Sequence, residues 1–301
     1  MRVLVSGASG MIGAALCDAL LARGDSVVGL SRDPQRARST NPSVVWHNWE
    51  PTLERPPAEA FEHVDGVVNL LGEKIDQRWT DDAKRRIVES RRTGTRNLVA
   101  AIAGLESKPK VLVNQAAIGY YGDRGDAIVD ESAEPGEGFD AGVVREWEAA
   151  AREVEASGVR LVILRTGHVL DANDGLLAAL LTPFKLGVGG PLAGGRQYMS
   201  WIHIDDEVGI LLWALDNKRV SGVVNATAPN PVTNREFSHA LGRALNRPAV
   251  VPVPGFVLDL KFGSEFGQIL RGGQRVMPRR ALDLGYEFRY SDIDTALKSL
   301  M

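Results

Sequence analysis

Short runs of β-branched and leucine residues alternate with longer amphipathic stretches along the first half of the chain. The apolar runs predict strands at residues 3–5, 27–30, 44–46, 67–70, 111–113 and 161–164. The stretches between them predict helices over residues 11–22, 81–102 and 143–156. Strands that alternate with helices are typical of a parallel sheet whose faces are covered by helices. The pattern therefore predicts an α/β protein.

Beyond Arg165 a glycine-rich interval interrupts this alternation. Five glycines and a proline lie within residues 187–195, a density that predicts loops. The wider interval from Phe184 to Gln197 also carries basic residues, and glycine hinges of this kind suit a lid over a binding site. A long surface connection is the alternative. We predict a lid-like insertion over about residues 171–200.

The alternation resumes in the last third of the chain. A helix is expected to begin with Asp205 as its N-cap and to end near Asp216. Further elements are expected as a strand at 223–225 and helices over 234–245 and 256–270. Prolines become frequent from residue 229 onward, and no linker is long enough to separate two independent domains. We predict a larger domain over residues 1–228, which includes the insertion, and a small C-terminal lobe over residues 229–301.

Composition and charge exclude several classes of protein. The formal net charge of −3, from 35 basic and 38 acidic residues, lacks the basic patch of a nucleic-acid or anionic-membrane binder. No apolar run reaches the length of a membrane span. Cys17 is the only cysteine, and the histidines at 47, 63, 168, 203 and 239 have no metal-ligand spacing. We expect a cytoplasmic protein with no metal, no disulfide and no membrane or nucleic-acid partner.

A glycine-rich turn follows the first predicted strand and opens the first predicted helix. Gly7, Gly10 and Gly13 have the spacing with which a dinucleotide-binding turn lets the backbone approach a pyrophosphate. The helix N-terminus adds free N–H groups and a partial positive charge. An ordinary glycine-rich turn is the alternative, but the strand and helix on either side favour cofactor binding. The residues predicted to contact the cofactor here are Gly7, Ser9, Gly10, Met11, Ile12 and Gly13.

The end of the second predicted strand indicates which dinucleotide is bound. Roughly 20 residues past the glycines, an NAD-binding protein carries an acidic residue that bonds the ribose hydroxyls. Ser31 and Arg32 occupy this position instead. An arginine can pair with a 2′-phosphate through charge-assisted hydrogen bonds. A solvated surface arginine is the alternative. We predict NADP(H) as the cofactor.

Further motifs lie along the rest of the chain: 67–71, Gly94-Thr95 with Asn97-Leu98, Gly119-Tyr120-Tyr121-Gly122, Arg165-Thr166-Gly167, 201–206 and 272–278. Together with the glycine turn they resemble an extended short-chain dehydrogenase/reductase. In particular they resemble the atypical, epimerase-like branch of the NAD-dependent epimerase/dehydratases that carries a small C-terminal domain of unknown function. The resemblance implies a Rossmann-type, doubly wound parallel sheet, a smaller C-terminal lobe on the substrate side, and bound NADP(H). It also implies cofactor contacts at Leu70, Leu71, Gly72, Arg91 and Arg165.

The sequence departs from this family at its catalytic residues. Extended members normally use a Tyr-x-x-x-Lys pair, but none of the five tyrosines here has a lysine four residues later. The helix expected to carry the pair has no tyrosine over residues 141–148. The serine expected at the fifth strand end is replaced within Asn114-Gln115-Ala116-Ala117. The usual acid and base groups are therefore missing.

Three other side chains are candidates for acid–base chemistry. Tyr120 and Tyr121 follow the fifth strand, where open α/β sheets place their ligands, although both rings could simply be packing groups. His203 precedes a predicted helix, although a histidine bonded to the backbone is the more common explanation of such a position. We name Tyr120, Tyr121 and His203 as catalytic candidates.

Two functional hypotheses follow. The first is an NADP(H)-dependent oxidoreductase or epimerase-like enzyme that acts on a small polar molecule. The second is a non-catalytic NADP(H)-binding regulatory or sensor module. The missing Ser/Tyr/Lys set favours the module, whereas the lid-like and substrate-side segments favour the enzyme, which we take as the first hypothesis. The substrate and the reaction are not defined by the residues, because a fold does not specify its chemistry. A homo-oligomer is compatible with either hypothesis.

Overall fold

A seven-stranded parallel sheet forms the centre of the larger lobe in the computed structural model, which describes residues 1–301. Its strands are β1 (Arg2–Ser6), β2 (Ser26–Ser31), β3 (Val45–Asn48), β4 (Gly66–Asn69), β5 (Val111–Ala117), β7 (Arg160–Thr166) and β11 (Gly222–Ala226). They lie in the order β11-β7-β5-β4-β1-β2-β3, with every pair parallel. The chain therefore winds one way from β1 to β3 and the other way from β4 to β11. This confirms the predicted doubly wound α/β sheet.

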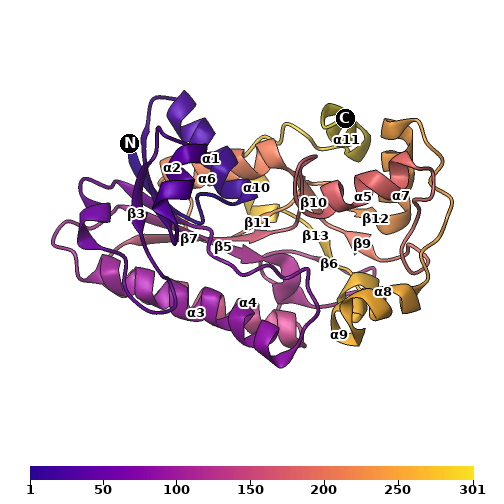
Figure 1. Cartoon of the computed structure of the whole chain (residues 1–301), viewed down its shortest axis with the longest axis horizontal. Helices are drawn as coiled ribbons and strands as arrows, with labels where there is room; N and C mark the ends of the chain where they lie inside the picture. Colours follow the sequence, from indigo (N-terminus) through magenta and orange to yellow (C-terminus); the bar gives the residue numbers. More distant parts are fainter.

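Helices cover both faces of the sheet (Figure 1). One face carries α1 (Met11–Ala22), α2 (Pro34–Thr40), α6 (Ile204–Asp216) and α10 (Arg279–Asp283). The other carries α3 (Asp81–Ala103), α4 (Phe139–Arg152) and the 3-10 turn η3 (Glu153–Ser157), with η1 (Ala58–Phe61) and η2 (Ile118–Tyr121) in the connections. Side chains alternate along each strand between an apolar core on the α1 face and one on the α3 face. Both cores exclude water, as parallel sheets require.

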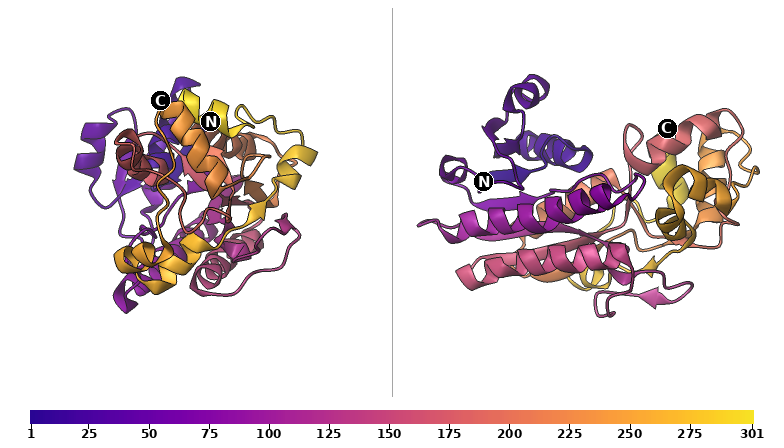
Figure 2. Two further views of the ribbon diagram at one scale, coloured as in Figure 1. Left: turned by 90° about the vertical axis from the view of Figure 1, so that its right-hand side faces the viewer. Right: turned by 60° about the horizontal axis from the view of Figure 1, so that its bottom comes forward.

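The smaller lobe combines the C-terminal residues with the predicted insertion (Figure 2). It contains β8 (His168–Leu170), α5 (Gly175–Lys185), β9 (Tyr198–Met199), β10 (Trp201–His203), β12 (Val232–Thr233), α7 (Asn234–Leu245), α8 (Gly255–Phe262), α9 (Ser264–Arg271) and α11 (Ile293–Ser299). The pair β6 (Ile128–Val129) and β13 (Arg275–Val276) ties it to the larger lobe. Its core joins Leu177, Phe184 and Trp201 to Phe237 and Leu297. Residues 171–200 thus pack with the smaller lobe.

Local signals explain most of the helix ends. Thr80 accepts the N–H of Ala83 and begins α3, and Thr233 forms a capping box with Glu236 at α7. The helix expected over 256–270 is two helices, because Gly263 between them has a φ of +87° that interrupts the helical backbone. The expected helix over 143–156 begins four residues earlier and ends as a 3-10 turn.

None of the helices is long and apolar enough to cross a membrane.

Candidate functional site

A cleft of about 1350 Å³ opens at the carboxyl edge of the sheet, over the ends of β1, β2 and β4. This is where the winding direction reverses, and open α/β sheets bind their ligands there. The cleft is lined by parts of the segments 7–10, 30–40, 49–52 and 70–77, and by Arg86, Glu89 and Ser90 on α3. Eight of the residues predicted to bind the cofactor line it: Gly7, Ser9, Gly10, Ser31, Arg32, Leu70, Leu71 and Gly72.

The glycine turn after β1 has the geometry of a phosphate cradle. Gly7 has a φ of +68°, and a Cβ on it would lie 2.7 Å from the Leu70 carbonyl oxygen. A Cβ on Gly13 would collide with the Gly7 carbonyl oxygen, so this glycine lets α1 pack closely on the turn. Gly10 is the N-cap of α1 and provides no side-chain cap. The first N–H groups of α1 are therefore left for an anion, whereas α3 uses Thr80 to satisfy its own.

Two arginines flank the cleft at the end of β2. Arg32 follows the strand, and Arg36 lies in the first turn of α2. The side chain of Asp33 accepts the N–H of Arg36 at 3.0 Å and so fixes the start of this helix. Both arginines are exposed, and neither forms an ion pair. The sequence analysis named Arg32 but missed Arg36. The residues Asp33-Pro34 are a helix-start signal, and this signal could have placed Arg36 in the first turn of a helix beside Arg32.

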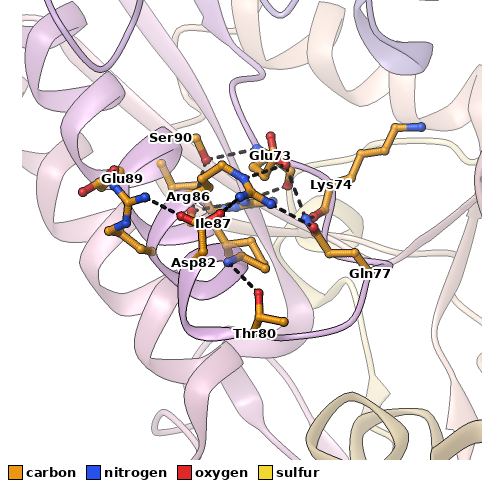
Figure 3. A network of polar contacts seen from close by, with 12 residues as sticks. Glu73, Lys74, Gln77, Thr80, Asp82, Arg86, Ile87, Glu89 and Ser90 are labelled. Atoms are coloured by element: carbon orange, nitrogen blue, oxygen red, sulfur yellow. Dashed lines mark hydrogen bonds and ion pairs between the residues drawn. The ribbon is translucent and has the colours of Figure 1, made fainter. Parts of the chain in front are cut away.

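The loop after β4 forms the outer wall of the cleft and is held by α3 (Figure 3). The Glu73 N–H donates to Ser90 Oγ at 3.0 Å, and the Glu73 carboxylate pairs with Arg86 at 3.5 Å. Arg91 lies behind this wall rather than in it: its Nη1 donates to the Glu73 carbonyl oxygen at 3.0 Å. A Cβ on Gly72 would lie only 2.9 Å from the Arg91 guanidinium. Arg91, predicted as a cofactor contact, therefore supports the wall from inside.

The environment of Arg91 explains why it can hold this position. Burial lowers the pKa of the guanidinium to about 10, against the opposing effect of the Glu73 charge. The group still stays protonated at neutral pH. It also lies 5.0 Å from the centre of the Trp147 ring, within cation–π range.

Arg165, the other arginine predicted as a cofactor contact, is buried and paired. Its Nε and Nη2 donate to the two carboxylate oxygens of Glu148 at 2.7 and 2.9 Å, and both side chains are 4% exposed. Burial alone would lower the pKa of Arg165, but the hydrogen bonds and charge of Glu148 raise it above its ordinary value. The guanidinium also lies 3.3 Å from the centre of the Tyr120 ring. Arg165 does not line the cleft.

The two candidate tyrosines have different surroundings. Tyr121 is fully buried, and its hydroxyl donates to Asn225 Oδ1 at 2.7 Å and accepts from Arg165 at 3.0 Å. Burial, partly offset by Arg165, raises its pKa to about 12. Tyr120 is half-buried, and no protein group hydrogen-bonds its hydroxyl. Tyr120 is thus the one of the pair whose hydroxyl is free to meet a ligand.

His203 caps a helix. Its Nδ1 accepts the N–H of Asp205 at 3.0 Å, its Nε2 lies 3.2 Å from Ser299 Oγ, and its ring stacks on Tyr290. The prediction that Asp205 is the N-cap of α6 is therefore wrong, because α6 begins at Ile204 and Asp205 points outward to pair with Arg289. Both ring nitrogens of His203 are engaged, as expected of a structural histidine.

The predicted lid is tied to the smaller lobe. Leu192 N–H donates to Asn234 Oδ1 at 2.7 Å, and Ala193 N–H donates to the Val253 carbonyl oxygen at 2.8 Å. The Gln197 side chain donates to the Leu192 and Leu270 carbonyl oxygens. These bonds join the glycine-rich segment to three separate parts of the lobe, so it extends the lobe's surface.

Comparison with known proteins places these features in context. The model of the NAD dependent epimerase/dehydratase family matches residues 3–226, and a domain of unknown function, DUF1731, matches residues 253–300. The epimerase family protein Mb2239 of Mycobacterium bovis is 40% identical over 296 residues, which cover 98% of this chain and 96% of that protein.

Two crystal structures are also similar to this chain. The human epimerase family protein SDR39U1 (isoform 2) with NADPH has a TM-score of 0.91 and 38% identity, covering 100% of this chain and 99% of that one. The nucleoside-diphosphate sugar epimerase from Corynebacterium glutamicum has a TM-score of 0.79 and 31% identity, covering 100% of this chain and 58% of that one.

Proposed function

Because the chain belongs to the NAD dependent epimerase/dehydratase family, we propose that it is an NADP(H)-dependent oxidoreductase or epimerase-like enzyme acting on a small polar molecule. The observation that carries the proposal is the cleft at the carboxyl edge, where an uncapped helix N-terminus and two unpaired arginines face the same space. NADPH in the human relative's structure supports the choice of cofactor.

The residues present fit NADP(H). The N–H groups at the start of α1 would hold the pyrophosphate, which can approach closely because Gly7 and Gly10 have no side chains. Arg32 and Arg36 would hold the 2′-phosphate, since both line the cleft and neither forms an ion pair within the protein. The cofactor supplies a hydride when it is bound. The loop after β4, which Arg91 supports, would keep water away from one side of the bound cofactor.

The cofactor preference can be tested by titrating NADPH and NADH into the parent protein and into Arg32→Ala and Arg36→Ala. Each charge-assisted bond to the 2′-phosphate contributes about 1.5–3 kcal/mol, or roughly 10- to 150-fold in the NADPH dissociation constant. NADH affinity should be unchanged. Arg38→Ala is the matched control, because Arg38 lies on α2 but does not line the cleft. Equal affinities of the parent protein for NADPH and NADH would remove the argument for a 2′-phosphate site.

The non-catalytic NADP(H)-binding module remains the second candidate, and a specific observation favours it. Ala116 and Ala117 end β5 without a hydroxyl, and α4 contains no tyrosine. The two candidates can be separated by incubating the protein with NADPH deuterated at either face of C4 and a panel of aldehydes and ketones that includes keto-sugar nucleotides. Deuterium in any product, detected by mass spectrometry, supports the enzyme. NADPH binding without transfer to any member of the panel supports the module.

A further inference from the structure

Burial raises the pKa of four carboxyl groups, Glu131, Asp140, Asp206 and Glu207. Three of them are bonded to other elements of the protein. Glu131 accepts two backbone N–H groups, and Asp206 accepts two others. Glu207 accepts from the side chains of Gln115 and Thr166. Asp140 differs, because its carboxylate meets only N–H groups of its own helix end. It is a half-buried acid with no structural partner.

The fold places Asp140 at the ligand-binding edge of the sheet. It is the second residue of α4, and its carboxylate lies against η2, the turn that follows β5. A Cβ on Gly119 in that turn would lie 3.5 Å from Asp140 Oδ2. That distance is an ordinary van der Waals contact, so the Asp140 carboxylate packs directly beside the turn.

The strand order places this carboxylate beyond the phosphate cradle. Arg32 stands at the end of β2, the glycine turn follows β1, and β4 and then β5 come next in the sheet. If the proposed function holds, a dinucleotide with its 2′-phosphate at Arg32 and its pyrophosphate at the turn extends its other half over β4 toward β5. Asp140 does not line the cleft itself but stands next to it at that end, beside which the reacting part of the cofactor would lie.

The charged and titratable groups on the surrounding elements are committed elsewhere. Arg165 on β7 is bonded to Glu148, Lys84 on α3 to Glu265, and Arg92 on α3 to Glu146. The Tyr121 hydroxyl on η2 is bonded to Asn225 and Arg165, which leaves Tyr120 as the other free group on that turn. No cation therefore holds Asp140 permanently in its ionised form, and burial raises the pKa of its carboxyl group above the ordinary value, which favours exchange of a proton with a bound ligand.

We propose that Asp140 is the general acid and base of this site. Reduction of a carbonyl group adds a hydride, which bound NADPH supplies, to the carbon and a proton to the oxygen. Asp140 gives that proton, becomes a carboxylate and is reprotonated from solvent. In the oxidation of an alcohol, the carboxylate takes the hydroxyl proton while the hydride passes from the carbon to NADP⁺, which would be the bound form of the cofactor. Asp140 thus performs the proton transfer for which this chain has no Tyr-x-x-x-Lys pair.

The test measures the pKa of Asp140 in two complexes and needs no substrate. Protein labelled with ¹³C at aspartate carboxyl carbons is titrated with acid and base by NMR, alone, with NADPH and with NADP⁺, and Asp140→Asn identifies the resonance. The oxidised nicotinamide ring carries a positive charge and the reduced ring does not. A neighbouring carboxyl should therefore titrate at least about one pH unit lower with NADP⁺ than with NADPH.

A second readout follows from linkage. In the parent protein, the affinity for NADP⁺ relative to NADPH should rise about tenfold or more as pH rises through the titration of Asp140, and Asp140→Asn should abolish the rise. The control variant Glu137→Gln removes an exposed carboxylate from the loop that precedes α4, and it should show the same rise in relative affinity as the parent protein. Equal Asp140 pKa values in both complexes, or the same rise in Asp140→Asn, would overturn this assignment while leaving the proposed cofactor intact. Failure of the parent protein to bind NADPH would instead overturn the proposed function and this inference with it.

Discussion

Replacing Glu148 by alanine should destabilise the protein more than any change to its surface ion pairs. Glu148 lies on α4 and receives two parallel hydrogen bonds from Arg165 on β7, with both side chains 4% exposed. Removing the carboxylate leaves a buried guanidinium whose remaining polar partner is the Tyr121 hydroxyl. Breaking one side of a buried pair of this kind costs about 3–5 kcal/mol, because an uncompensated charge stays inside the protein.

The free energy of unfolding should be measured by urea denaturation for Glu148→Ala, Arg165→Ala and the double variant. The double variant removes both charges and should cost clearly less than the two single changes added together. The matched control is Glu146→Ala, two residues away on α4. Glu146 pairs with Arg92 at 2.9 Å, but the two side chains are 48% and 39% exposed. This change should cost about 0–1 kcal/mol.

Two outcomes would refute this reasoning. If the two single costs add to within about 0.5 kcal/mol of the double variant's cost, the groups do not interact strongly. If Glu148→Ala costs no more than Glu146→Ala, the carboxylate is not needed to compensate a buried charge. NADPH titration of the variants that remain folded also tests the prediction that Arg165 contacts the cofactor, since a purely structural arginine leaves the affinity unchanged.

Three further predictions concern the turn, the tyrosines and a buried acid. Gly10→Val should keep the far-ultraviolet circular dichroism spectrum, because a Cβ there meets only the Gly7 carbonyl oxygen at 3.3 Å, but it should abolish NADPH binding by blocking the pyrophosphate. Parental affinity in that variant would show that the turn is not the cradle. Tyr121→Phe should lower the free energy of unfolding by about 1–3 kcal/mol, because it leaves the buried hydrogen-bond partners of the hydroxyl unsatisfied. Tyr120→Phe should change the free energy of unfolding by less than about 0.5 kcal/mol. Equal effects of the two changes in urea denaturation would contradict the assigned contacts. Burial raises the pKa of Glu207 from 4.5 to about 7, so the native state holds a proton that the unfolded state releases, and stability falls between these pH values as pH rises. As pH rises through this window, the free energy of unfolding of Glu207→Gln, measured by urea denaturation, should therefore increase relative to that of the parent by about 1.4 kcal/mol per pH unit. If the free energies of the two proteins change in parallel with pH, the pKa of Glu207 is not raised.

The sequence alone determined the strands and helices whose signals are local. The bounds of α1 and α7 were predicted at both ends, and the predicted strand positions locate all seven strands of the central sheet. Short β-branched runs, caps and glycines act on their immediate neighbours, so a linear pattern captures them. The glycine turn was predicted for the same reason. Its proposed role as a phosphate cradle depends on backbone geometry that the three glycines themselves permit.

Tertiary structure alone decided which charged residues are buried and which elements share a core. From the sequence, Arg91 and Arg165 were predicted to contact the cofactor, as Arg32 was. In the structure only Arg32 lines the cleft. Arg91 and Arg165 lie inside the protein, hydrogen-bonded to Glu73 and Glu148, which are 18 and 17 residues away in the sequence. Residues 171–200 pack with the smaller lobe because their apolar side chains meet a core made by distant helices. Asp140 stands out only where α4 meets the turn after β5. Burial and partnership arise from contacts between distant segments, and these determine whether a side chain is structural or free to act on a ligand.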